Sequence, residues 1–148
     1  MPATRVIIDM QEDFSAACRP EVICGVKKEI EIAILENAPI IIVEYIDCGK
    51  TRKEIIDLVD CHDLAVKVKK SGDCGTRVVL NAIKKNKFPS DHIRVCGVNT
   101  DWCVRETVNG LLRSLKETKI ELVKSACGDN NVYYNWEYFT KHQNLELV

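Results

Sequence analysis

The most informative part of the sequence is VCGVNTDWCV, residues 95–104, in which an apolar strand passes through a polar turn into a helix. Residues 93–98 are typical of a buried strand, and residues 99–101 are turn and helix-capping types. The apolar residues that follow recur at helical spacing: Val104, Val108, Leu111, Leu112 and Leu115. Cys103 is therefore expected in the first turn of a helix, where unpaired N–H groups favour an anion. We predict that this position lowers the thiol pKa from about 8.5 towards neutrality.

Short β-branched runs alternate with longer helical patterns along the rest of the chain. The expected strands are residues 5–8, 39–46, 64–70, 93–98, 120–125 and 145–148. The expected helices are residues 21–37, 53–59, 76–86, 101–117 and 135–142. This alternation is typical of a parallel sheet with helices on both faces, linked by right-handed crossovers. We expect a three-layer, doubly wound, Rossmann-like α/β fold with a mostly parallel six-stranded sheet.

Length and charge restrict the class of protein. With 148 residues, of which 46% are hydrophobic, the chain suits one domain spanning residues 1–148. Its 21 basic and 22 acidic residues give a net charge of -1, which indicates no nucleic-acid or anionic-membrane partner. No apolar run reaches the roughly 18 residues that a membrane span needs.

Eight cysteines lie at positions 18, 24, 48, 61, 74, 96, 103 and 127. No CxxC pair occurs and no histidine stands at zinc-finger spacing, so we expect free thiols and no structural zinc. Cys24, Cys96 and Cys127 are interpreted as small buried hydrophobes. Because the amino terminus lacks the pattern of a signal segment, a cytoplasmic protein is expected.

Four polar residues are expected at one edge of the sheet. In doubly wound sheets, ligands bind beyond the carboxyl ends of the strands. Asp9 follows the first strand, Lys69 and Lys70 end the third, and Cys103 follows the fourth. A carboxylate can accept the thiol proton and an ammonium can offset the resulting charge, so Asp9 and a lysine suit a cysteine nucleophile.

Other common catalytic patterns are disfavoured. His62 and His92 precede expected strands, and His142 lies in the last expected helix, so none of the three is placed near Cys103. This argues against a Cys–His hydrolase. The chain has neither a GxGxxG nor a GxxxxGK[ST] segment, so glycine-based nucleotide binding is not indicated.

Two motifs and a lysine carry a family resemblance: VIIDMQEDF at residues 6–14, a lysine ending the third strand, and GVNTDWCV at residues 97–104. Over about residues 5–128 the chain resembles the isochorismatase-like cysteine hydrolase superfamily. The resemblance implies that Asp9 is the general base, Cys103 the nucleophile and the lysine the third catalytic member. It further implies a small-molecule substrate whose amide-like C–N bond is cleaved through a thioester.

The resemblance also implies a cis peptide bond between Val98 and Asn99. The Asn99 N–H would then point, with that of Cys103, at the carbonyl oxygen under attack. Loss of one such oxyanion donor typically costs on the order of 100-fold or more in rate.

Three lysines compete for the catalytic position. An ungapped fit to the family pattern K-x-x-x-S-A-F-x-G-T selects Lys67, whereas a variant resembling K-x-x-D-x-G fits residues 70–75 directly. Strand alternation places Val66, Val68 and Lys70 on one face, and Lys67 and Lys69 on the other. We favour Lys70, with Lys69 as the alternative because one residue of twist or bulge would exchange them.

Some amidases of this superfamily, nicotinamidases among them, have a D-x-H metal motif after the second strand. This chain has Asp47-Cys48-Gly49 there, without the imidazole. We therefore predict no catalytic metal and no cofactor, and nicotinamidase activity is disfavoured.

Aromatic residues are candidates for the walls of the cleft: Phe14, Trp102, Tyr133, Tyr134 and Trp136. Phe14 and Trp102, which flank the two motifs, are predicted to contact substrate, although core packing would explain any one of the five. Homo-oligomers are common among proteins of this resemblance, so assembly with copies of this chain is expected, without a sequence feature that identifies the interface.

Two other functions fit the same residues. A non-catalytic member of the family would keep the fold and act as a binding or scaffold protein. Alternatively, Cys103 is a redox-active thiol whose sulfenate is resolved by Cys74.

Overall fold

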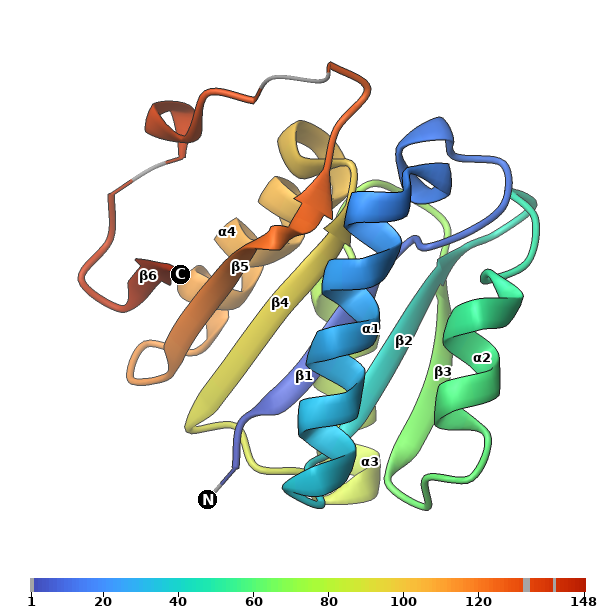
Figure 1. Cartoon of the computed structure of the whole chain (residues 1–148). Coiled ribbons are helices and arrows are strands. Elements are labelled where there is room, and N and C mark those ends of the chain that lie inside the picture. Colours follow the sequence, from blue (N-terminus) through green and yellow to red (C-terminus); the bar gives the residue numbers. More distant parts are fainter. Residues whose placement is uncertain (1, 132–133, 140) are drawn as a thin grey trace.

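The computed structural model describes residues 2–131, 134–139 and 141–148, which build one six-stranded parallel sheet (Figure 1). The strand order is β3-β2-β1-β4-β5-β6, and every neighbouring pair is parallel. The strands are β1 (Thr4–Ile8), β2 (Ile40–Tyr45), β3 (Ala65–Lys70), β4 (His92–Val98), β5 (Lys119–Gly128) and β6 (Leu145–Leu147). The predicted three-layer α/β fold is confirmed.

Helices cover both faces of the sheet. One face carries α1 (Pro20–Leu35) and α2 (Lys53–Val59), and the other carries α3 (Thr76–Asn86) and α4 (Arg105–Ser114) (Figure 1). The chain leaves β1 for β2 over the first face and returns from β3 to β4 over the second. Strand order therefore reverses between β1 and β4, and ligands of such sheets bind at the carboxyl ends of the strands beside that point.

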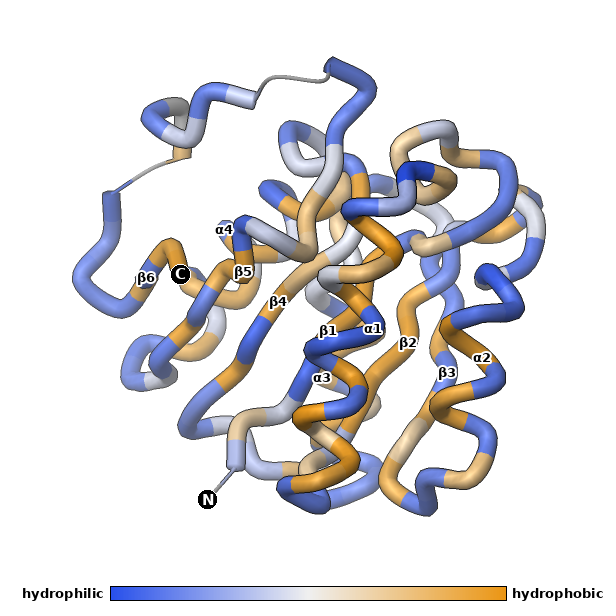
Figure 2. The backbone as a smooth tube through the Cα atoms, viewed as in Figure 1, coloured by the Kyte–Doolittle hydropathy of each residue, from blue (hydrophilic) through white to orange (hydrophobic). Residues whose placement is uncertain are grey.

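Successive residues of the central strands enter two separate hydrophobic cores. Val6 and Ile8 of β1 are buried under α3 and α4, whereas Ile7 is buried under α1 and α2. Both faces of the strand are thus apolar, and the neighbouring strand β2 likewise reads as a nearly continuous hydrophobic run (Figure 2).

The helix expected over residues 101–117 differs in its first turn. Residues Thr100–Val104 form a wider π-helical turn, η2, and the α-helix begins only at Arg105. Cys103 therefore lies in this turn, ahead of α4.

The helix expected over residues 135–142 is wrong for the part that is described. A short 3₁₀ turn, η3 (Trp136–Tyr138), stands there, and residue 140 lies outside the described residues. Trp136 and Phe139 pack with Tyr134 against the core beneath α3 and α4. These aromatic contacts hold the segment without the helix that was expected there.

The expected burial of three cysteines holds in part. Cys96 is buried and Cys127 is half-buried, but Cys24 is exposed. The buried face of α1 contains Val22, Val26 and Ile30, and Cys24 lies two residues from Val22, on the opposite side of the helix.

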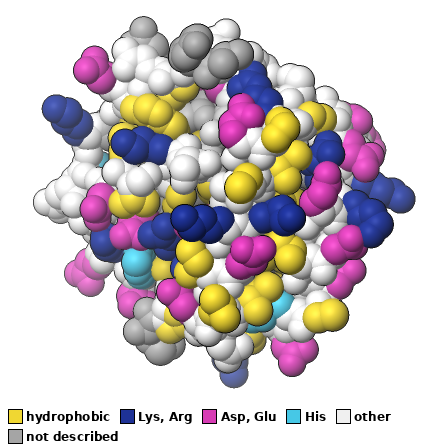
Figure 3. All heavy atoms as spheres, viewed as in Figure 1, with side chains coloured by type: hydrophobic (Ala, Val, Ile, Leu, Met, Phe, Trp, Pro, Cys, Tyr) yellow, Lys and Arg dark blue, Asp and Glu magenta, His cyan; other side chains and the backbone are white. Residues whose placement is uncertain are grey.

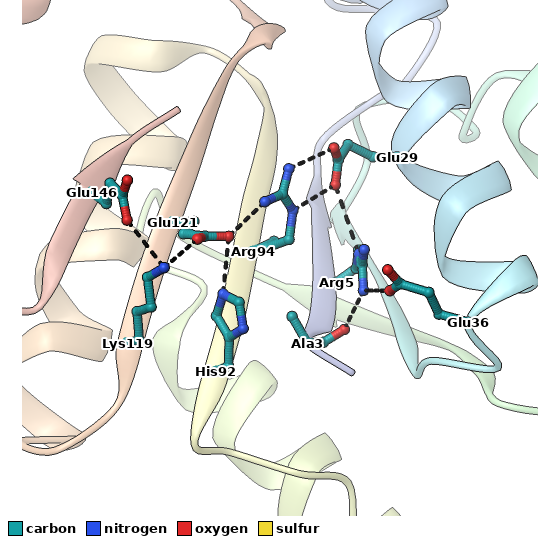
Figure 4. A network of polar contacts seen from close by, with 9 residues as sticks. All are labelled: Ala3, Arg5, Glu29, Glu36, His92, Arg94, Lys119, Glu121 and Glu146. Carbon is teal, nitrogen blue, oxygen red and sulfur yellow. Dashed lines mark hydrogen bonds and ion pairs between the residues drawn. The ribbon is translucent and has the colours of Figure 1, made fainter. Parts of the chain in front are cut away.

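A chain of ion pairs crosses the sheet beneath α1 (Figure 4). Arg5, Arg94, Glu121 and Glu146 are register partners on β1, β4, β5 and β6. Glu29 of α1 accepts from Arg94 at 2.8 and 2.9 Å and lies 3.7 Å from Arg5. The network therefore ties α1 to strands on both sides of the switch point.

The surface over α1 and α2 carries both signs of charge, interspersed with hydrophobic side chains (Figure 3). Lys84, Lys85 and Lys87 are exposed at the end of α3 and form a solvated helix end. Among the described residues, no helix is both long and apolar enough to cross a membrane.

Candidate active site

Asp9 stands at the carboxyl end of β1 and is 1% exposed. Its φ of +52° lies in the left-handed region, which short polar side chains tolerate better than most. The Asp9 N–H donates to Val43 O at 2.9 Å, and Asp9 O accepts from Gln11 N at 2.7 Å. These bonds fix the turn that carries the carboxylate.

Lys70, the last residue of β3, is 3% exposed. Its Nζ lies 3.0 Å from Asp9 Oδ2 and donates to Gly72 O at 2.8 Å. Because β2 lies between β3 and β1, the side chain must cross it, and Nζ sits 4.0 Å from the ring centroid of Tyr45 on β2. A cation over an aromatic face is attracted by the ring quadrupole, so Tyr45 favours this route.

Cys103 completes the cluster from the η2 turn and is 5% exposed. Its Sγ accepts a hydrogen bond from Lys70 Nζ at 3.2 Å, and the thiol contacts Asp73 Oδ1 at 3.9 Å. The structure thus brings Asp9, Lys70 and Cys103 together at the carboxyl ends of three strands.

The backbone of residues 97–99, just before the η2 turn, lies close to the end of β1. The Val98–Asn99 peptide bond is cis, as the family resemblance implies. Gly97 has a φ of +121°, and a Cβ atom there would lie 2.1 Å from Ile8 O. Asn99 O then accepts from Trp102 N at 3.1 Å and from Val104 N at 3.2 Å, which closes the η2 turn around Cys103.

The sequence matches no protein-family model and no curated protein, whereas the structure has clear counterparts. N-carbamoylsarcosine amidase from Thermoplasma acidophilum aligns over 99% of this chain and 95% of its own, with a TM-score of 0.74 and 21% identity. An isochorismatase family protein aligns over 99% and 97%, with a TM-score of 0.73 and 14% identity. The nicotinamidase from Staphylococcus aureus aligns over 87% and 85%, with a TM-score of 0.71 and 14% identity.

The chain has the isochorismatase-like fold. At these identities the likeness shows the fold, and the chemistry depends on the side chains at the site.

Within this isochorismatase-like fold, the other two candidate lysines lie away from Cys103. Lys67 and Lys69 are exposed on the opposite face of β3, where both line a surface cavity beside Glu44. Lys67 Nζ is 3.8 Å from Glu44 Oε2. The alternation predicted for this strand is therefore present, and Lys70 alone of the three contacts Asp9 and Cys103.

The predicted lowering of the Cys103 pKa is wrong. Burial and the adjacent Asp9 carboxylate raise the thiol pKa to about 12, against the opposing effect of Lys70. The prediction relied on the unpaired N–H groups of a helix's first turn, whereas the structure buries the sulfur in a π-helical turn beside the Asp9 carboxylate. Burial also raises the pKa of Asp9, although Lys70 and Cys103 act in the other direction. The proton therefore stays on sulfur in the resting site.

Two residues that hold the lysine in place were missed from the sequence. Tyr45 lies under the Lys70 ammonium, and Gln11 fixes the end of β2. The Gln11 side chain donates to Tyr45 O at 2.8 Å and Gly49 O at 2.9 Å, and accepts from Tyr45 N at 2.6 Å. The register that pairs Tyr45 with Lys70 exists only in the folded sheet, so no sequence signal indicated the first contact.

The predicted wall residues are dispersed. Phe14 is half-buried, with its ring centroid 6.4 Å from that of Tyr45, and Trp102 is 57% exposed beside Cys103 in the chain. Tyr134 and Trp136 pack against each other with centroids 5.1 Å apart, and Tyr133 lies outside the described residues. Contact of Phe14 and Trp102 with substrate stays a prediction.

Gly49, which stands where the D-x-H motif would have its histidine, lies close to the Asp13 carboxylate. A Cβ atom on Gly49 would lie 2.7 Å from Asp13 Oδ1, so a larger residue would not fit without a shift of that carboxylate. Within residues 2–131, 134–139 and 141–148, no three His, Cys, Asp or Glu side chains are grouped to hold a metal ion. The residues present do not fit the metal centre that the D-x-H motif would provide.

Proposed function

We propose that the protein is a small-molecule cysteine hydrolase that cleaves an amide-like C–N bond through a thioester on Cys103. One observation carries the proposal: a buried ammonium, Lys70 Nζ, lies 3.0 Å from a carboxylate oxygen of Asp9 and 3.2 Å from the Cys103 sulfur. The names of two similarly folded proteins, an N-carbamoylsarcosine amidase and a nicotinamidase, support this reaction class.

In the first step, the Cys103 sulfur attacks the carbonyl carbon while Asp9 accepts the thiol proton. A thiol pKa of about 12 means that little thiolate exists beforehand, so proton transfer accompanies attack. Lys70 offsets the negative charge that passes from carboxylate to sulfur and then to the carbonyl oxygen. The N–H groups of Asn99 and Cys103 are the proposed oxyanion donors.

In the second step, the tetrahedral intermediate collapses and its C–N bond breaks. The leaving ammonia or small amine takes the proton from Asp9, and the acyl group remains on sulfur. Water then attacks the thioester with Asp9 as base, which releases the acid and restores the thiol.

The test is a screen of small amides, carbamoyl compounds and ureido acids for ammonia release, comparing wild type with Cys103→Ala. Cys74→Ala is the matched control, because the Cys74 sulfur contacts Thr76 Oγ1 and Glu106 O and the proposal gives it no role. We expect Cys103→Ala to lose at least about 10³-fold in kcat/KM and Cys74→Ala to keep wild-type turnover. Full activity of a correctly folded Cys103→Ala protein, checked by circular dichroism, would contradict the proposal.

A further inference from the structure

The loop between β3 and α3 holds a second carboxylate beside the sulfur. Asp73 is exposed, and its Oδ1 lies 3.9 Å from Cys103 Sγ. Lys70 Nζ donates to Gly72 O at 2.8 Å on one side of Asp73, and Gly75 N donates to Thr107 Oγ1 at 2.8 Å on the other. The position of Asp73 is thus fixed by the same lysine that contacts the nucleophile.

The charges around the sulfur do not balance. Asp9 and Asp73 are two acidic side chains, and Lys70 is the one cation among residues 2–131, 134–139 and 141–148 that contacts the cluster. Lys70 pairs with Asp9, and none of the described residues forms an ion pair with Asp73. Asp73 also contributes to the raised pKa of Asp9, after the larger effect of burial. The solvent side of the nucleophile therefore carries an uncompensated negative charge.

We propose that Asp73 determines substrate specificity by selecting amides that carry a cationic group, such as a protonated amine, next to the scissile carbonyl. The inference rests on the proposed function. Asp73 Oδ1 lies 3.9 Å from Sγ, so a charged group joined to a carbonyl carbon that bonds to Sγ comes within range of its electrostatic effect. A cation there gains the attraction of Asp73, whereas a substrate carboxylate meets like charge.

The first test measures the charge preference of Cys103 without any turnover. Three methanethiosulfonates are used: one with a trimethylammonium group, one with a sulfonate and one with only a methyl group. Each forms a mixed disulfide with the thiol and releases methanesulfinate. Rate constants at Cys103, obtained by peptide mass mapping, are divided by those for a free small thiol. Asp63→Asn is the matched control, because exposed Asp63 precedes β3 at the opposite edge of the sheet.

We expect the normalised cationic-to-anionic rate ratio to fall about five- to tenfold in Asp73→Asn and to stay unchanged in Asp63→Asn. The ratio in wild type should also fall with added salt, since an exposed carboxylate is screened. Equal ratios in wild type and Asp73→Asn overturn the inference alone. Failure of all three reagents to label Cys103 contradicts the nucleophile assignment as well, because the thiol would then be closed to small molecules.

The second test uses amides of similar size that differ in charge: glycinamide, propionamide and malonamate. In the wild-type protein, kcat/KM should follow the order cationic, neutral, anionic, and Asp73→Asn should compress that order. Faster turnover of malonamate than of glycinamide overturns the charge selection while leaving the proposed hydrolase function intact.

Discussion

At the scale of single residues, the site depends on a lysine that is buried only because its charge is fully contacted. Lys70 Nζ meets Asp9 Oδ2, Gly72 O, Cys103 Sγ and the Tyr45 ring. An ammonium or a carboxylate buried without such partners would cost several kcal/mol. Asp9 and Lys70 are therefore each required for the other to be tolerated inside the protein.

Lys70→Met should destabilise the protein by about 3–5 kcal/mol, because it leaves the Asp9 carboxylate buried without a counter-ion. Lys69→Met, one residue earlier and exposed, should change the free energy of unfolding by less than about 0.5 kcal/mol. Urea denaturation of both variants measures the difference. Equal effects of the two substitutions would contradict the assignment of Lys70 to the buried cluster.

The pH dependence of turnover follows from the raised pKa of Asp9. Below that pKa the carboxyl group is protonated and cannot accept the thiol proton, so kcat/KM should rise with pH through a midpoint above 3.8. Asp73→Asn removes one contribution to the raised pKa and should move this acid limb to lower pH. A profile of kcat/KM against pH for both proteins is the measurement. An acid limb that Asp73→Asn shifts to higher pH would be inconsistent with this electrostatic account.

At the scale of elements, period-two alternation in β3 was enough to predict which lysine shares a face with Val66 and Val68. The turn geometry was not predictable in the same way. A capping pattern at residues 99–101 suited an α-helix, but the structure winds a wider turn there and buries Cys103. Sequence periodicity indicates which face of a helix or strand is apolar. The pKa of the Cys103 thiol depends instead on burial and on Asp9 and Lys70, which come from other strand ends.

The charge network beneath α1 should make stability sensitive to acid. Burial alone would raise the pKa of Glu121, but hydrogen bonds from Lys119, His92 and Arg94 outweigh it and lower the pKa to about 2. A depressed carboxyl pKa contributes stability that is present above the usual value of 4.5 and is lost as pH falls towards 2.

Glu121→Gln should therefore lower the free energy of unfolding by about 1–3 kcal/mol at neutral pH. It should also flatten the loss of stability of the protein between pH 4.5 and pH 2. Chemical denaturation across this pH range measures both effects. Glu137→Gln is a suitable control, because Glu137 is exposed on η3. An unchanged acid dependence in Glu121→Gln would show that ionised Glu121 does not contribute to the stability lost in acid.

At the scale of the whole molecule, the alternation of strands and helices predicted the layers, and the rule that ligands bind beyond the carboxyl ends of the strands predicted the edge that holds the candidate site. The contact of Tyr45 with Lys70 and the short 3₁₀ turn in place of a helix after residue 135 depend on tertiary structure and were not predicted. Homo-oligomerisation and a cytoplasmic location stay predictions. Similarly folded proteins are named for different substrates, so the fold does not identify the substrate. The residues around Cys103 must determine which substrate binds.

The proposed mechanism requires Cys103 to carry the acyl group during turnover. Mass spectrometry of acid-quenched protein, incubated with the most active amide of the screen, tests it most directly. We expect a mass increase equal to the acyl portion, located on the peptide that contains Cys103, released by hydroxylamine and missing in Cys103→Ala. An adduct on another residue, or turnover by Cys103→Ala at the wild-type rate, would contradict it.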